Sequence, residues 1–283
     1  MIDCHIHMVL DGGWWKDALA RHAERPDEAF IRRTLAHYGS LGCTYLRDGG
    51  DRWRVGERAA ELSSEYGIRY RTPCFPIYCR GHYGSFIGCG FETLEEYRTL
   101  VRQVRSRGGH FIKIMISGLM DFNHFGVLTE PPLEAALIAD LVHLAHDEGF
   151  PVMAHANGDG AVLPALAAGV DSVEHGAYLS EQALLALAES GAVWCPTLST
   201  VGNLVGEGRF PDEVTQKILA YQLDAVRLAA SHGGLIACGS DAGAWAVPHG
   251  EGAQSEGKWL SLALGDDWES VIERGNHAIM EIF

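Results

Sequence analysis

The sequence predicts an α/β fold, a (β/α)8 TIM barrel. Eight short apolar segments alternate with amphipathic helical segments over 283 residues, a length that suits eight strand–helix units. Polar residues gather at the ends of several apolar segments, where barrel active sites form. An open doubly wound sheet is the alternative, but no glycine-rich phosphate loop follows any strand. No linker divides the chain, so we expect residues 1–283 to form one domain.

Each expected strand is a short apolar run, and many are followed by turn-forming glycine, aspartate or proline. The eight strands are expected at residues 1–8, 42–47, 68–78, 111–116, 151–155, 170–175, 192–197 and 235–239. Alternation along the first strand places Asp3, His5 and His7 on one face and Cys4 on the other. It likewise turns Glu174 away from the face of its neighbour, into a buried hydrogen bond or salt bridge.

Helix signals fill the segments between the strands. The segment 93–107 carries Glu95 and Glu96 early and Arg105 late, which is the charge order that the helix dipole favours. Gly67 ends the helix before it. Helices are expected at residues 26–38, 54–66, 93–107, 133–148, 160–168, 181–190, 212–231 and 266–283, and the segment after residue 239 is expected to be a loop.

Charge and cysteine content limit the classes of partner and compartment. A net charge of −15 argues against nucleic acid and anionic membranes, which bind basic surfaces. Seven cysteines without a C-x-x-C pair indicate a reduced, cytoplasmic chain. No signal peptide precedes the first strand, and no apolar run is long enough to cross a bilayer. We therefore expect a small-molecule substrate.

Residues that suit metal binding stand on five of the expected strands or directly after them. They are His5, His7, Lys113, His155, His175 and Asp241. In a barrel the C-terminal ends of the strands meet at one mouth, so these side chains are expected to converge. Imidazoles and carboxylates together suit Zn²⁺, and also Mn²⁺ or Fe²⁺. The sequence therefore predicts a metal site.

Lys113 is the most informative of these residues, because the chain has only four lysines. The isoleucines beside it would pack on helices, which places Lys113 inside the barrel. Burial favours the neutral amine, which can react with CO2 to give a carbamate able to bridge two metals. Alternatively, Lys113 pairs with a buried carboxylate such as Asp241.

This pattern resembles the amidohydrolase superfamily of metal-dependent hydrolases. The match covers essentially the whole chain and looks like the branch with prolidase-type and imidazolonepropionase-related enzymes. It is carried by the stretches Ile112-Lys-Ile-Met-Ile-Ser-Gly118, Ala154-His-Ala156, Ala168-Gly-Val-Asp-Ser-Val-Glu-His-Gly-Ala-Tyr178 and Gly239-Ser-Asp-Ala-Gly243. The lysine favours the binuclear, prolidase-like side of the branch.

The resemblance implies a centre of two divalent ions, with Zn²⁺ as the first candidate. His5, His7 and Asp241 would hold one ion and His155 and His175 the other, bridged by the carboxylated lysine and a hydroxide. Members of this branch usually carry an accessory β-sandwich, and none is expected here, since the first strand begins at residue 2. This leaves the barrel floor to be covered by the C-terminal tail or by homo-oligomerisation.

The expected reaction is hydrolysis of a C–N bond in an amide, a cyclic amide or a dipeptide-like compound. A metal-activated hydroxide would attack the carbonyl, and Asp241 would carry the proton to the leaving nitrogen. By the resemblance, Tyr178 and His82 polarise the carbonyl. Two alternatives stay open: hydrolysis of a lactone or phosphoester on the same barrel, and a non-catalytic protein that binds metal or a small molecule.

Several loop residues are candidates for contact with the substrate. Aromatic residues after strands 1, 3 and 8, among them Trp245, either line a pocket or pack loop on loop. The polar candidates are Arg80, His82, His124 and Tyr178. Arg80 would hold a substrate carboxylate through a bidentate contact.

Overall fold

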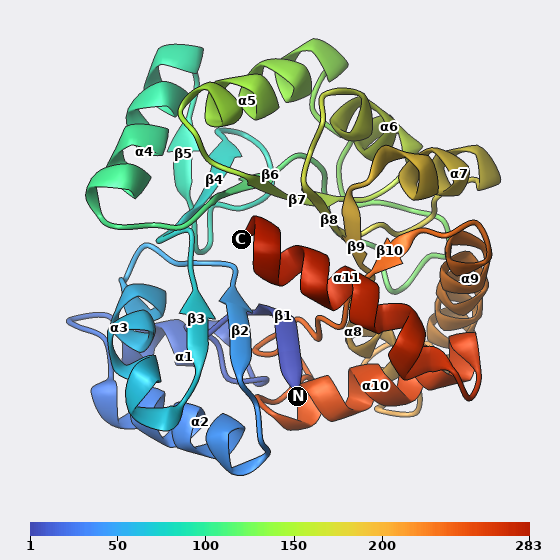
Figure 1. Ribbon diagram of the computed structural model, residues 1–283, viewed down its shortest axis with the longest axis horizontal. Coiled ribbons are helices and arrows are strands. Elements are labelled where there is room, and N and C mark those ends of the chain that lie inside the picture. Colours follow the sequence, from blue (N-terminus) through green and yellow to red (C-terminus); the bar gives the residue numbers. More distant parts are fainter.

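The computed structural model describes residues 1–283, and all ladders between its strands are parallel. The strands are β1 (Ile2–Ile6), β2 (Tyr45–Asp48), β3 (Arg69–Arg71), β4 (Pro76–Cys79), β5 (Cys89–Phe91), β6 (Ile112–Met115), β7 (Val152–Ala156), β8 (Ser172–His175), β9 (Val193–Cys195) and β10 (Leu235–Ile236). Each of the eight expected strands is present, with helices around the outside, so the predicted TIM-barrel class is confirmed (Figure 1).

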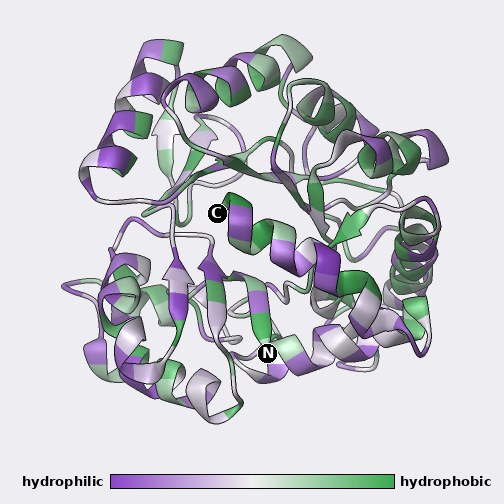
Figure 2. Cartoon of the chain, in the orientation of Figure 1, coloured by the Kyte–Doolittle hydropathy of each residue, from purple (hydrophilic) through white to green (hydrophobic).

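The helices form most of the outer layer, and their ribbons mix hydrophobic and hydrophilic segments, as expected of helices that bury one face (Figure 2). They are α1 (Trp15–Arg21), α2 (Glu28–Ser40), α3 (Val55–Leu62), the 3-10 helix η1 (Ser63–Tyr66), α4 (Leu94–Ser106), α5 (Ala135–Asp147), α6 (Asp159–Ala167), α7 (Glu181–Ser190), α8 (Ser199–Gly202), α9 (Asp212–Ser231), α10 (Glu251–Leu264) and α11 (Trp268–Ile282). None has the length and apolar character needed to span a bilayer.

Helix α10 lies where the sequence predicts a loop. Its two glycines lower the intrinsic helix propensity of the segment, so the sequence pattern does not indicate a helix there. Packing explains one of them, because a Cβ on Gly257 would lie 3.0 Å from a ring carbon of Trp268 in the next helix. Tertiary contact therefore outweighs local propensity here.

The third barrel strand is split in two. Its first half, β3, pairs with β2, and its second half, β4, pairs with β6. Between them the backbone of Cys74 adopts a positive φ of 65°, which interrupts the extended conformation. As a result the strands form a three-stranded sheet, β1–β2–β3, and a seven-stranded sheet that runs from β10 to β5.

Hydrogen bonds join the two sheets on the opposite side, between β1 and the segment after β10. The amide of Cys4 donates to the Cys238 carbonyl at 2.8 Å, and the amide of His7 donates to the Ala242 carbonyl at 2.7 Å. The amide of Asp241 donates to the carbonyl of His5, also at 2.7 Å. These bonds hold the first and eighth strand positions side by side.

Strand β1 departs from regular alternation, because its register with β2 shifts between Asp3 and Ile6. Cys4 is buried in the cluster at the barrel floor, whereas the Asp3 carboxylate accepts hydrogen bonds from the amide and hydroxyl of Ser240. The prediction that Asp3 shares a face with the two histidines and that Cys4 lies behind them is therefore wrong. The shift lets consecutive side chains, Cys4 and His5, both reach the interior.

The C-terminal helix covers the barrel floor. Helix α11 crosses the middle of the helix ring, and the C-terminus lies near its centre (Figure 1). Ile279 and Phe283 join a buried cluster with residues from the N-terminal ends of strands, and the rings of Phe283 and Phe111 pack edge-on, with centroids 5.2 Å apart. Coverage by the tail, one of the two outcomes expected for the floor, is thus observed.

Candidate metal centre and active site

Three predicted ligands meet between β1 and the segment after β10. The nearest donor atoms of His5, His7 and Asp241 all lie within 4.8 Å of one another. The Nε2 atom of His7 is 3.2 Å from the Asp241 Oδ1 atom, and that of His5 is 3.5 Å from it. His5 Nε2 and Asp241 Oδ1 are buried and have no hydrogen-bond partner. Two imidazoles and a carboxylate with unused lone pairs fit a divalent cation.

A second pair of imidazoles lies beside this group. His155 on β7 and His175 at the end of β8 have ring centroids 4.6 Å apart, and the His175 ring is 5.1 Å from that of His5. Burial lowers the pKa of all three rings well below the ordinary value for histidine. They are therefore neutral, which is the form that binds metal.

Lys113 on β6 points its amine into the same space. The Nζ atom is buried without a hydrogen-bond partner, and no carboxylate forms a salt bridge with it. Burial lowers the pKa of Lys113 to about 8, although the carboxylates of Glu174 and Asp241 act in the opposite direction. The predicted interior position is observed, and the alternative ion pair with Asp241 is not. The amine is thus buried among three imidazoles without a partner of its own.

Glu174 orients His5. Its Oε2 atom is 2.7 Å from His5 Nδ1, so the Nδ1 proton is donated to the carboxylate and the Nε2 lone pair is left facing Asp241. The Oε1 atom accepts hydrogen bonds from the Arg47 guanidinium at 2.8 Å and from the Ser172 hydroxyl at 2.6 Å. All of these side chains are fully buried. The predicted salt bridge is present, but its role beside a ligand was missed.

The prediction that Glu174 and His175 face opposite ways is wrong, because both reach the interior. His175 has a positive φ of 68°, which turns its ring to the same side. The turn is held by a hydrogen bond of 3.0 Å from the Trp194 indole to the His175 carbonyl, and His175 Nδ1 lies 2.7 Å from the Thr197 hydroxyl. The carboxylate beside a strand-end histidine was the signal that sequence reading could have used.

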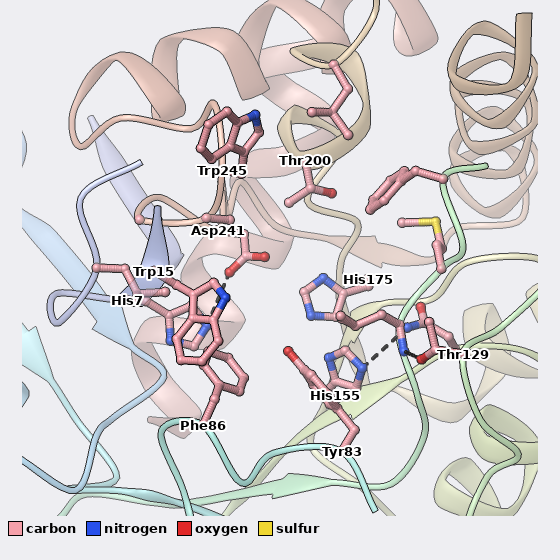
Figure 3. Close-up of a pocket in the computed structure, with 18 of the residues that line it drawn as sticks. His7, Trp15, Tyr83, Phe86, Thr129, His155, His175, Thr200, Asp241 and Trp245 are labelled. Carbon is pink, nitrogen blue, oxygen red and sulfur yellow. Dashed lines mark hydrogen bonds and ion pairs between the residues drawn. The ribbon is translucent and has the colours of Figure 1, made fainter. Parts of the chain in front are cut away.

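The candidate ligands stand at the inner end of a cavity of about 570 Å³, a volume typical of small-molecule sites. Figure 3 shows His7, Asp241, His155 and His175 around its centre, with Trp15 and Phe86 on the His7 side and Tyr83 beside His155. Aromatic residues make up much of the lining: Trp14, Trp15, Tyr83, Phe86, Phe122, Phe210 and Trp245. Trp245 is thus where the sequence predicts it.

The other four predicted contacts do not line the cavity. The Arg80 guanidinium lies 3.3 Å from each of two surface carboxylates, and the His124 side chain is 72% exposed. His82 lies near Glu130, and Tyr178 packs against the ring of Phe125. Loop conformation, which the sequence pattern does not encode, separates these residues from the site.

Several solved structures resemble this one. A Xaa-Pro dipeptidase with bound methionine superposes with a TM-score of 0.81 at 21% identity, covering 100% of this chain and 75% of that one. A prolidase complexed with N-methylphosphonate-L-proline gives 0.71 at 25% identity, with coverage of 99% and 73%. The ochratoxinase of Aspergillus niger gives 0.79 at 21% identity, with coverage of 98% and 70%. Likenesses at 21% identity show a shared fold.

Sequence relatives lead to the same group. The Aspergillus niger ochratoxinase is 25% identical over 284 residues, which cover 84% of this chain and 56% of that protein. The chain thus spans about half the length of this relative. Together with the prolidase, it confirms the predicted resemblance to the prolidase-like branch. The amidohydrolase family model matches residues 1–279, nearly the whole sequence. The chain therefore belongs to the amidohydrolase family.

Proposed function

We propose that the protein is a metal-dependent hydrolase that cleaves the C–N bond of an amide, a cyclic amide or a dipeptide-like compound. The convergence of His5, His7 and Asp241, with unpartnered donor atoms at the inner end of a 570 Å³ cavity, carries the proposal. Similarity to proteins named ochratoxinase and prolidase supports amide-type substrates.

In this proposal two divalent ions are bound, with Zn²⁺ as the first candidate. His5, His7 and Asp241 would hold one ion, and His155 and His175 would hold the other. Lys113, once carboxylated, would supply a further ligand, which its unpartnered amine supports. When bound, such ions lower the pKa of water and polarise a carbonyl group.

Asp241 is placed to move the proton. Its side chain lines the cavity and is 13% exposed, so a substrate in the cavity would reach it while little of it faces solvent. A positive φ of 60° and the hydrogen bond that its backbone amide donates to the His5 carbonyl fix its position. In the proposed reaction its carboxylate accepts the proton of the attacking water and returns it to the leaving nitrogen.

Tyr83 takes the place that was expected for Tyr178 and His82. Its hydroxyl points into the cavity, and its ring centroid lies 4.9 Å from that of His155 (Figure 3). Burial raises the pKa of Tyr83 well above its usual value, so the hydroxyl keeps its proton at neutral pH. We assign it the role of hydrogen-bond donor to the substrate carbonyl oxygen.

A substrate panel tests the proposal. Protein loaded with Zn²⁺ or Mn²⁺ is offered N-acyl amino acids, dipeptides, cyclic imides, lactones and aryl phosphates. Hydrolysis of one of the first three classes, lost in Asp241→Asn, is expected. Activity confined to lactones or phosphates would establish the rival esterase function.

Metal analysis tests the remaining alternative, a protein that binds metal without catalysis. The wild type is expected to hold two ions per chain, and His175→Ala and Lys113→Ala fewer. His143→Ala, on the outer helix α5, is the control and should keep both. A wild type that holds metal but hydrolyses no compound of the panel would favour the binding function.

A further inference from the structure

A cation stands on the cavity wall without an acidic partner. Arg209 is exposed; its backbone amide donates to the Glu207 carboxylate at 3.1 Å, but its guanidinium forms no salt bridge. It lies instead over three aromatic rings, 4.2 Å from the centroid of Trp245, 5.3 Å from that of Phe210 and 5.6 Å from that of Trp14. These rings come from three different loops, after β1, after α8 and after β10.

The charge of the cavity makes this position informative. Its lining includes only two lysine or arginine residues, the buried Lys113 at the inner end and the exposed Arg209. The two lining carboxylates are those of Asp241, at the metal site, and Asp121, which is 2.7 Å from the ring of His124. In a chain with a net charge of −15, the guanidinium thus remains free to bind an anion from solution.

A row of aromatic rings connects the guanidinium with the metal ligands. From Trp14 the centroid separations are 6.2 Å to Trp15, 5.9 Å from there to Phe86, 5.7 Å to Tyr83 and 4.9 Å to His155. Successive rings at these spacings form a continuous apolar wall. Trp14 and Trp245, at the outer end, are 43% and 36% exposed. The cavity therefore has a metal-binding end, an aromatic wall and a cationic end.

We propose that Arg209 and the rings of Trp14, Phe210 and Trp245 form an anion-binding subsite, which we call the outer subsite. It selects amides in which an aromatic or large apolar body separates the scissile carbonyl from a carboxylate. The proposal rests on the proposed function for the position of the scissile bond. The three rings would hold the guanidinium in place through cation–π contacts and leave N–H groups for a bidentate contact.

Paired probes test the outer subsite by binding, without turnover. N-methanesulfonyl-4-(aminomethyl)benzoate places its carboxylate beyond a phenyl ring, and its 4-carboxamide analogue has the same shape without charge. Calorimetry on metal-loaded wild type is expected to show at least about tenfold tighter binding of the carboxylate. Arg209→Gln should bring the two dissociation constants together, whereas Arg209→Lys should keep part of the preference.

Arg98→Gln is the control, since Arg98 is an exposed arginine on α4 outside the cavity, and it should keep the full preference. Equal binding of both probes by the wild type, or an undiminished preference in Arg209→Gln, overturns the proposal. N-acetylphenylalanine and its carboxamide, compared as inhibitors, test the spacing, because this carboxylate lies beside the amide bond. If the wild type prefers this carboxylate too, and Arg209→Gln loses that preference to the same extent, the anion is bound beside the scissile bond, which also overturns the proposal.

Hydrolysis separates the two proposals. N-acetyl-4-(aminomethyl)benzoate and its carboxamide analogue are compared as substrates of the same variants. Hydrolysis of both, with a carboxylate preference in kcat/KM that is independent of Arg209, overturns the outer subsite alone. An Arg209-dependent preference in binding, with no hydrolysis of any amide, supports the subsite and overturns the proposed function alone.

Discussion

His5 and Glu174 lie 2.7 Å apart inside the barrel, with the ring and the carboxylate both fully buried. The contact sets the tautomer of the imidazole, since only the Nδ1 proton can satisfy a carboxylate oxygen. Arg47, on β2, balances the charge of Glu174, on β8. One buried ion pair thus determines which nitrogen of His5 faces Asp241.

Glu174→Gln should therefore weaken metal binding by about 10–100-fold, because the ring of His5 loses its anionic partner. Zinc affinity measured by competition with a chromophoric chelator checks this. The variant should also unfold more easily, by roughly 3–5 kcal/mol, since Arg47 is left buried without a counter-ion. Glu61→Gln, which removes only an exposed pair with Arg58, is the control and should leave both quantities nearly unchanged.

Tyr83→Phe should lower kcat by about 100-fold with little change in metal content, because a donor to the developing oxyanion is removed. Tyr178→Phe is the matched comparison, since that ring packs between Phe125 and Tyr221 outside the cavity. Steady-state kinetics on the best amide of the panel give the answer. A loss confined to Tyr178→Phe would return the role to the residue that the sequence indicates.

Glu256 should make the protein less stable as the pH rises. Its side chain is buried under the amides of Leu198 and Ser199, and burial raises its pKa from 4.5 to about 8. The folded state thus holds a proton that the unfolded chain has released between these values. The free energy of unfolding should fall by about 1.4 kcal/mol per pH unit across that window from this group.

Urea unfolding between pH 4.5 and 8.5 measures that slope. Glu256→Gln does not titrate and should have a shallower profile than the wild type. Some slope will remain, because burial also raises the pKa of Asp51, to about 7. Identical profiles for variant and wild type would show that Glu256 is ionised throughout.

Ile279→Ala should destabilise the fold by about 2–5 kcal/mol, because it opens a cavity in the barrel floor. Ile282→Ala, three residues along the same helix, removes the same atoms from a side chain that is 37% exposed and should cost less than about 0.5 kcal/mol. Thermal or urea unfolding compares the pair. A small effect at both positions would mean that α11 contributes little to the stability of the barrel.

The sequence correctly predicts the positions of the candidate site residues that lie at strand ends. It predicts side-chain directions wrongly where the backbone departs from regular strand geometry. The six candidate ligands converge because parallel strands bring their C-terminal ends to one mouth. Asp3 and Cys4 are assigned to the wrong faces because a register shift breaks the two-residue period. Glu174 is misassigned because the positive φ of His175 rotates one side chain out of sequence.

Loop residues were harder to predict, because their positions depend on contacts between distant segments. Tyr83 enters the cavity and its neighbour His82 does not, although both belong to one loop. The position of Arg209 on the cavity wall could not be predicted from the sequence, because it depends on contacts with rings from two other loops. The periodicity of the sequence does not predict such contacts, because they form between loops that are distant along the chain.

The split third strand gives one of the two proposed metal ions a second, structural role. His5 lies on β1 of the three-stranded sheet and His7 directly after it, whereas Asp241, His155 and His175 belong to the seven-stranded sheet or to the segment that extends it. On one side of the ring, strand pairing is interrupted between β3 and β4. On the other side, β1 and the segment after β10 are joined by backbone hydrogen bonds outside the regular strand ladders. The ion held by His5, His7 and Asp241 would have ligands from both parts of the ring and would link them, so chelation should loosen the whole ring as well as empty the site.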